Sequence, residues 1–152
     1  METSIQRRGR ISPGRAMPKP PRDAWVGRVL IADDDPAVRL LCAVNLRCEG
    51  LQVLEAEDGL DALDRARRER PDLVLTDVKM PGLDGFQLAQ RLRGDERTRR
   101  IPLIFLTGED GQANAERARA LGALAYISKP FDPPALAAFV AHQLAIAHAD
   151  SQ

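Results

Sequence analysis

Five polar residues stand at the ends of four short apolar runs, and their types suggest one chemical site. Asp33 and Asp34 follow the first run, Asp77 the second, Thr107 the third and Lys129 the fourth. In an open parallel sheet, the carboxyl ends of the strands share one edge, where ligands of such folds bind. Carboxylates, a hydroxyl and an ammonium at one edge predict a site for a divalent cation and a phosphoryl group.

The three aspartates require a cation if they converge, because neighbouring carboxylates repel one another and raise one another's pKa. Mg²⁺ fits this need, since it takes oxygen ligands and commonly binds through one or two carboxylates plus a phosphate oxygen. Mn²⁺, which suits the same ligands, is the expected substitute. Lys129 adds a positive charge and Thr107 a hydroxyl donor for phosphoryl oxygens. The remaining aspartate is then placed to attack phosphorus and form an aspartyl phosphate.

From residue 28 onward, apolar runs of strand length alternate with segments of helical period, which predicts an α/β fold with a parallel sheet. The expected strands are near 28–33, 51–56, 72–77, 101–107 and 124–128. The expected helices are near 36–49, 59–69, 85–93, 112–121 and 133–147. Asp35 before Pro36 indicates a helix start, and Asp84 with Gln87 indicates a capping box. The last helix carries an apolar stripe that we expect to pack on the sheet: Leu136, Phe139, Val140 and Leu144.

The composition excludes several classes of protein. Hydrophobic residues make up 44% of the 152 residues, which is ordinary for one globular domain. No run approaches the roughly 18 apolar residues of a membrane span, and no secretory signal is apparent, so we expect a cytoplasmic protein. Cys42 and Cys48 lie on different faces of one expected helix. We interpret both as small hydrophobic residues rather than as a disulfide or a zinc site.

Residues 1–26 form a basic, proline-rich segment that we expect to be a disordered tail. Residues 1–27 carry six basic side chains against two acidic ones, with four prolines and almost no apolar periodicity. Such a segment cannot bury enough surface to offset its ordering entropy. Contact with nucleic acid or an acidic partner is a lesser alternative, and Met17 is an alternative start of translation. The arginines of 65–70 and 97–100 are interpreted as solvated helix and loop faces, with nucleic-acid binding as a lesser alternative.

Several segments together resemble the receiver domain of response regulators, the phosphate-accepting half of two-component signalling pairs. They are VLIADDDP at 29–36, DVKMPGLDG at 77–85, IP at 101–102 with TG at 107–108, and LGA at 121–123 with KPF at 129–131. Their order and spacing are specific, and the resemblance covers residues 28 to about 147. It implies a flavodoxin-like, doubly wound sheet of five parallel strands in the order 2-1-3-4-5, with five helices.

The resemblance also implies the ligands of a magnesium site and the phosphoacceptor. Asp77 is the implied phosphoacceptor. The implied metal ligands are Asp34 directly, Asp33 largely through water, Asp77, and the backbone carbonyl of Lys79.

By the same resemblance, Lys129 corresponds to the lysine that contacts the phosphoryl group, and its bond to Pro130 is expected to be cis. Thr107 and Tyr126 correspond to a switch pair, in which the hydroxyl moves toward the phosphate and the ring turns inward. This motion is expected to reshape a face that binds a downstream protein. The face comprises the helix near 112–121, the strand near 124–128 and the helix near 133–147. A phosphorylation-dependent homodimer is a further expectation for the exposed faces.

Lys79 and Glu109 are candidates for setting the lifetime of the phosphate. They stand two residues after Asp77 and two after Thr107, and they carry opposite charges. Their side chains could screen the acyl phosphate from water, or Glu109 could orient that water. The first interpretation is preferred and predicts faster loss of phosphate in Lys79→Ala. The alternative without a function is an exposed ion pair worth about 0–1 kcal/mol.

The sequence therefore predicts a single-domain response regulator spanning 27–148, with a C-terminal tail at 149–152 and no DNA-binding domain. It would take phosphate from a histidine kinase or a histidine phosphotransfer protein, and would catalyse only its own phosphorylation and dephosphorylation. One alternative is a receiver segment of a larger hybrid kinase or regulator. An aspartate-dependent phosphatase is disfavoured because Asp77-Val78-Lys79 lacks a second acid/base aspartate. A flavin-binding flavodoxin is disfavoured because the first strand ends in aspartates rather than in a phosphate loop.

Overall fold

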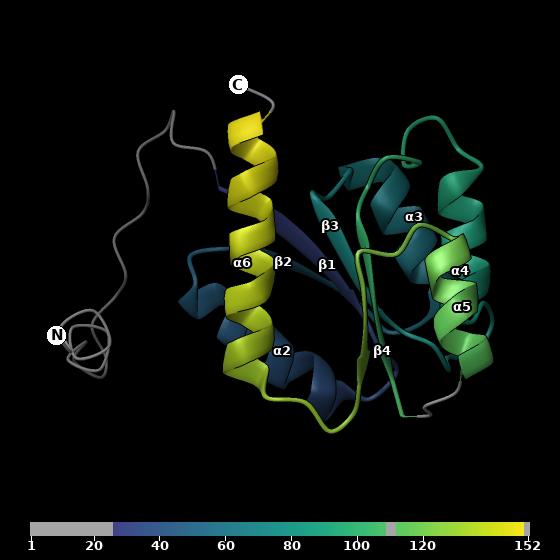
Figure 1. The fold of residues 1–152 in the computed structure, drawn as a ribbon, viewed down its shortest axis with the longest axis horizontal. Helices are drawn as coiled ribbons and strands as arrows, with labels where there is room; N and C mark the ends of the chain where they lie inside the picture. The colour runs from purple at the N-terminus through teal and green to yellow at the C-terminus, as the bar shows by residue number, and fades with distance from the viewer. Residues whose placement is uncertain (1–25, 109–111, 151–152) are drawn as a thin grey trace, which may run out of the picture.

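Strands and helices alternate along the chain in a computed structural model that describes residues 26–108 and 112–150 (Figure 1). Glu109 and residues 1–25 of the predicted tail lie outside this part. The strands are β1 (Arg28–Ala32), β2 (Gln52–Ala56), β3 (Leu73–Asp77), β4 (Leu103–Thr107) and β5 (Ala125–Ser128). The helices are α2 (Pro36–Cys48), α3 (Gly59–Glu69), α4 (Gly85–Arg93), α5 (Gln112–Ala120) and α6 (Pro133–Asp150).

The five strands form one parallel sheet in the order β2-β1-β3-β4-β5, which confirms the predicted fold class and strand order. β1 pairs with β2 on one side and with β3 on the other, so the direction of winding reverses between β1 and β3. In doubly wound sheets, the crevice outside the carboxyl ends at such a reversal is the usual place for a ligand. Asp33 follows β1 and Asp77 ends β3, so both stand at this crevice.

Helices cover both faces of the sheet. Figure 1 shows α2 and α6 on one face and α3, α4 and α5 on the other. Ile31 and Leu75 belong to an apolar cluster with α2 and α6, whereas Leu30 and Val74 belong to a cluster with α3 and α4. Alternate residues of a strand therefore enter opposite layers. Because both faces are covered, all residues of β3 and β4 are buried and the central strands read as continuous apolar runs.

Side-chain caps start the two helices that flank the site. Asp35 accepts a hydrogen bond from the backbone N–H of Ala37, with Pro36 in the first turn of α2. Asp84 and Gln87 form a reciprocal capping box at the start of α4. Both caps confirm predictions from the sequence. Each satisfies backbone donors that the first helical turn leaves without a partner.

Some details differ from the predictions. α6 continues to Asp150, three residues beyond the expected end. Phe139 does not belong to its buried stripe: the residue is 36% exposed, and Ala137 is buried instead. Ala137 and Leu144 stand seven residues apart, two helical turns, with the buried Val140 between them, and Phe139 falls outside that line.

The two cysteines of α2 also differ from each other, since Cys42 is buried and Cys48 is exposed. Both are free thiols, and only Cys42 packs in the apolar core. Among the helices of residues 26–108 and 112–150, none combines the length and apolar character needed to cross a bilayer.

Candidate functional site

The carboxylates of Asp33, Asp34 and Asp77 converge at the carboxyl edge of the sheet. One oxygen from each lies within 4.8 Å of the others. Asp33 and Asp77 are buried, whereas Asp34 is exposed. The sheet causes this convergence, because β1 and β3 pair in register from Val29 with Leu73 to Ala32 with Thr76 and therefore end together. An all-oxygen donor set of this kind suits a hard divalent cation.

Lys129 joins the two buried carboxylates. Its Nζ lies 3.2 Å from Oδ2 of Asp33 and 3.4 Å from Oδ2 of Asp77. Its backbone N–H donates to the carbonyl of Thr107 at 2.7 Å, so the backbone after β5 is tied to the end of β4. The peptide bond from Lys129 to Pro130 is cis. The structure thus brings together the two buried aspartates and the lysine, which are 96 residues apart at most.

The three carboxylates carry more negative charge than the single ammonium of Lys129 can balance. Burial raises the pKa of the Asp77 carboxyl above its usual value, the charge of Asp33 raises it further, and Lys129 opposes both effects. Burial on its own would lower the pKa of Lys129, but Asp33 and Asp77 outweigh this effect and the pKa is raised. One ammonium therefore pairs with two buried carboxylates, and the exposed carboxylate of Asp34 lies beside them. A bound cation would relieve this excess of negative charge.

Thr107 and Tyr126, the expected switch pair, lie on neighbouring strands. Thr107 is the last residue of β4, is 2% exposed, and pairs in register with Ser128. Its neighbour Leu106 pairs with Asp77, so the hydroxyl-bearing residue ends the strand next to the expected phosphoacceptor. Tyr126 is partly buried and packs against the apolar cluster on the α4 side of the sheet. Their role as a switch stays a prediction.

Of the two residues expected to set the phosphate lifetime, only Lys79 lies in the described part of the chain. Lys79 is exposed in the loop between β3 and α4, two residues beyond Asp77. Glu109 lies outside the described residues, so the proposed contact between the two side chains stays a prediction.

The sequence analysis missed one residue near the site, Arg39, and did not place a second, Cys42, beside it. Arg39 donates from Nη1 to the backbone carbonyl of Asp33 at 2.6 Å. Cys42 is 2% exposed, and burial raises the pKa of its thiol to about 11, with the charge of Asp33 contributing and Lys129 opposing. No motif marks either residue. Arg39 lies in the first turn of α2 and Cys42 at its middle, and only the docking of that helix against β1 reveals their neighbours.

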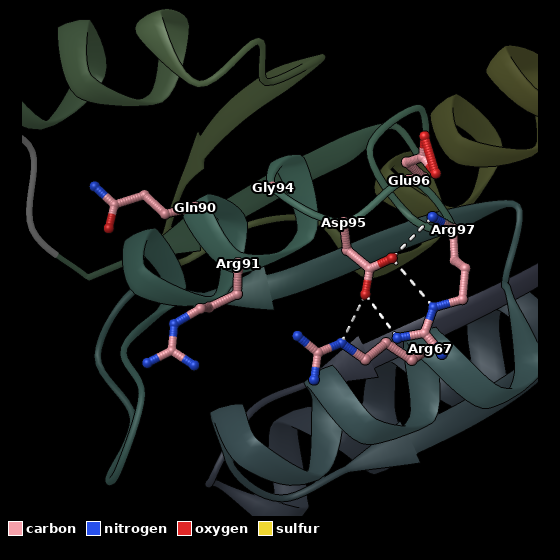
Figure 2. Close-up of a pocket in the computed structure, with 7 residues that line it drawn as sticks. All are labelled: Arg67, Gln90, Arg91, Gly94, Asp95, Glu96 and Arg97. Atoms are coloured by element: carbon pink, nitrogen blue, oxygen red, sulfur yellow. Dashed lines mark hydrogen bonds and ion pairs between the residues drawn. The ribbon is translucent and has the colours of Figure 1, made fainter.

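A separate group of charged residues lies at the opposite edge of the sheet, where α3 and α4 end (Figure 2). Its residues line a hollow of about 580 Å³: Arg67, Gln90, Arg91, Gly94, Asp95, Glu96 and Arg97. Asp95 accepts hydrogen bonds from the side chain and backbone of Arg97 and from Arg67. These bonds, those of Arg97 first, hold the pKa of the Asp95 carboxyl well below its usual range. Arg67 and Arg97 are therefore ion-paired, not simply solvated as predicted.

The comparison with known proteins agrees with this geometry. Residues 29–141 match the family model described as the response regulator receiver domain. The chain belongs to the response regulator receiver family. The resemblance found in the sequence is thereby confirmed, and with it the assignment to two-component signalling.

Individual members of the receiver family align over most of the described chain. PilH of Pseudomonas aeruginosa is 40% identical over 111 residues, covering 73% of this chain and 92% of PilH. The DNA-binding dual master transcriptional regulator RpaA of Synechocystis is 42% identical over 105 residues, covering 69% of this chain but 44% of RpaA. The solved structure of the chemotaxis protein CheY4 of Vibrio cholerae has a TM-score of 0.72 at 30% identity, covering 76% of this chain and 97% of CheY4.

Proposed function

We propose that this chain is a response regulator that accepts a phosphoryl group on Asp77 in a phosphorelay. One observation carries the proposal: Lys129 bridges Asp33 and Asp77 at a point where three carboxylates converge. A structural ion pair would need one carboxylate for one ammonium. The surplus of buried negative charge is what a phosphate-transfer site requires, because a cation and the ammonium together can then hold the phosphoryl oxygens.

The donor would be a phosphohistidine of a histidine kinase or of a histidine phosphotransfer protein. A carboxylate oxygen of Asp77 attacks phosphorus, the bond from phosphorus to the imidazole nitrogen breaks, and the electron pair of that bond stays on the imidazole, which takes up a proton. The product is an aspartyl phosphate. Lys129, which contacts Asp33 and Asp77, would face the phosphoryl oxygens as a compact positive charge.

The three carboxylates fit Mg²⁺, and Mn²⁺ would suit the same donors. Asp34, Asp33 and Asp77 would hold the ion, with the backbone carbonyl of Lys79 as a further ligand. When bound, the ion supplies positive charge that neutralises the carboxylates and the phosphoryl oxygens during transfer. In this arrangement the chain acts only on itself, and no other substrate is proposed.

The signal would pass through Thr107 and Tyr126. The Thr107 hydroxyl, at the end of the strand beside Asp77, would donate to the new phosphate, and the Tyr126 ring would turn inward from its partly buried position. The face made of α5, β5 and α6 would then bind a downstream protein or a second copy of the chain. Lys79 and Glu109 would set how long the phosphate survives.

Residues 27–148 would act as the receiver unit in the cytoplasm, with 1–26 before it and 149–152 after it, of which Ala149 and Asp150 continue α6. The alternative, a receiver segment of a larger kinase or regulator, is supported by relatives such as RpaA, of which the chain spans less than half.

The test uses a small phosphodonor. Incubation with acetyl phosphate and Mg²⁺ is expected to add one phosphoryl group to the protein, detected by intact-mass spectrometry. Asp77→Asn should remain unmodified, whereas Asp64→Asn, which changes an exposed aspartate of α3, should be modified as the wild type is. An unmodified wild type, or modification that persists in Asp77→Asn, would overturn the proposal.

A further inference from the structure

Every polar atom of Asp33 has a partner. Its backbone N–H donates to the carbonyl of Ala56 at 3.2 Å. Its Oδ1 accepts from the backbone N–H of Asp35 at 2.9 Å, and its Oδ2 accepts from Lys129 at 3.2 Å. Its carbonyl accepts from Nη1 of Arg39 at 2.6 Å. Backbone and side chain of Asp33 are therefore fixed in one orientation.

Asp34 is the opposite case. Its side chain is exposed, and it forms no hydrogen bond or ion pair with any other residue of the described ranges. Its carboxylate nevertheless lies within the 4.8 Å cluster with Asp33 and Asp77. The direction in which the Asp34 side chain leaves the backbone depends on the plane of the peptide that joins it to Asp33, because a peptide group is rigid. The oxygen of that peptide is the atom that Arg39 holds.

Arg39 is itself held in place. It lies in the first turns of α2, its side chain is 17% exposed, and its Nε is 3.5 Å from Oε1 of Glu55 on β2. Glu55 also pairs with Arg47, which lies about two turns beyond Arg39 on α2, at 3.8 Å. The guanidinium of Arg39 thus links the start of α2, the end of β1 and β2. Its planar fork allows it to bond a carbonyl and a carboxylate at once.

We propose that Arg39 is a positioning residue for the cation site, acting through the Asp33 carbonyl to aim the Asp34 carboxylate. The inference rests on the proposed function, since it concerns the same site. Arg39 touches none of the three carboxylates through the contacts described, and so it is not itself a ligand. It acts as the outer partners of metal ligands do, by fixing the orientation of a ligand that has no other constraint.

An electrostatic role and a positioning role of Arg39 predict opposite effects on cation binding. A guanidinium bonded to Asp33 repels an incoming cation, so an arginine with only an electrostatic role would weaken cation binding, and Arg39→Ala would tighten it. A positioning role predicts that Arg39→Ala weakens binding, because the entropy of ordering Asp34 then falls on the binding step. The two roles therefore differ in the sign of one measured change.

The test measures the affinity for Mg²⁺ alone by two-dimensional NMR titration of the unphosphorylated protein, at fixed pH and ionic strength. Arg39→Ala is expected to bind Mg²⁺ about tenfold more weakly, the lower end of what loss of an outer partner costs. Arg39→Lys, which keeps the charge and one donor, should recover part of that loss. Arg47→Ala is the matched control, because it removes the same charge and the other partner of Glu55 from the same helix without touching Asp33.

A double-mutant cycle asks whether Arg39 acts through Asp34. Once Asp34→Asn has weakened binding, adding Arg39→Ala should cause little further loss, because the ligand that Arg39 positions is already gone. Independent, multiplicative losses would overturn the inference, as would affinity in Arg39→Ala equal to or tighter than that of the wild type. Should Arg39→Ala fail to fold, Arg39→Lys and Arg39→Gln provide the same comparison.

Failure of the proposed function looks different. If the wild type itself binds no Mg²⁺, the cation site is absent, and both the proposed function and the role of Arg39 are refuted. If the wild type binds Mg²⁺ and Arg39→Ala binds it equally, only the role of Arg39 is refuted.

Discussion

At the scale of single residues, the site brings together carboxylates that repel one another when no cation is bound. Asp77 is buried beside the charge of Asp33, and Lys129 cannot neutralise both. The pKa of Asp77 is therefore higher in the folded chain than in the unfolded one. The stability that this group provides is present at acid pH, below the unfolded-state pKa, and is lost as the pH rises through the folded-state pKa.

A prediction follows for Asp77→Asn at neutral pH. Without a divalent cation, the variant should unfold at a higher urea concentration than the wild type, because the buried negative charge of Asp77 next to Asp33 has been removed. With Mg²⁺ at about 100 times its dissociation constant, the wild type should gain about 2.7 kcal/mol and the variant much less. Urea denaturation with and without Mg²⁺ measures both effects. Equal gains in the two proteins would show that Asp77 does not take part in the cation site.

The sequence predicted the carboxylates and the lysine because each follows its own apolar run, and the parallel sheet brings such ends together. It did not predict Arg39, whose partner is a backbone carbonyl. A backbone acceptor leaves no mark in the sequence, so no spacing rule could have paired Arg39 with Asp33.

At the scale of elements, close approach between α4 and the end of β3 fixes the loop that carries Lys79. A Cβ atom on Gly85 would overlap the backbone oxygen of Asp77 and lie 3.0 Å from Cα of Val78. The N–H of Gly85 also donates to the Val78 carbonyl at 2.7 Å. Only glycine permits this contact, so the start of α4 packs directly against the backbone of Asp77, the proposed phosphoacceptor.

Gly85→Ala should therefore destabilise the fold by about 2–3 kcal/mol, the cost of overpacking against backbone that cannot yield. Gly94→Ala, at the other end of α4, is the control: its added Cβ would lie 3.4 Å from the Gln90 carbonyl, with φ at −85°. That variant should stay within about 0.5 kcal/mol of the wild type. Urea denaturation separates them, and similar midpoints for the two variants would contradict the steric argument.

Most of the element order could be predicted, because strands buried on both faces read as apolar runs and two helix starts carry caps. The hydrogen bonds that link one element to another could not be predicted. Arg93 of α4 donates to the carbonyls of Arg99, Ile101 and Leu121, and so ties α4 to the loops that precede β4 and follow α5. In the sequence, this arginine resembles any basic residue in the last turn of a helix.

At the scale of the whole molecule, opposite edges of the sheet carry two different groups of charged residues. The carboxyl edge holds the aspartate cluster, and the amino edge holds the arginine-lined hollow of Figure 2. At the amino edge, Arg97 and Arg67 hold the pKa of Asp95 below its unfolded-state value. The stability that Asp95 provides is therefore present above the unfolded-state pKa and is lost as the pH falls through the folded-state pKa.

Asp95→Asn is accordingly expected to be less stable than the wild type at pH 7, with a difference that shrinks as the pH falls below the unfolded-state pKa near 3.8. Urea midpoints across this pH range measure the change. Asp64→Asn, which breaks an exposed ion pair with Arg68 on α3, should have a much smaller effect. A difference for Asp95→Asn that does not vary with pH would mean that the carboxylate's charge is not the cause.

The aspartate cluster makes the carboxyl edge locally negative, because Lys129 offsets only one of its three carboxylate charges. This field would attract a partner with a positively charged surface before contact and would orient that surface toward the aspartate cluster. Encounters would then be fastest in dilute buffer and would slow as added salt shortens the reach of the field.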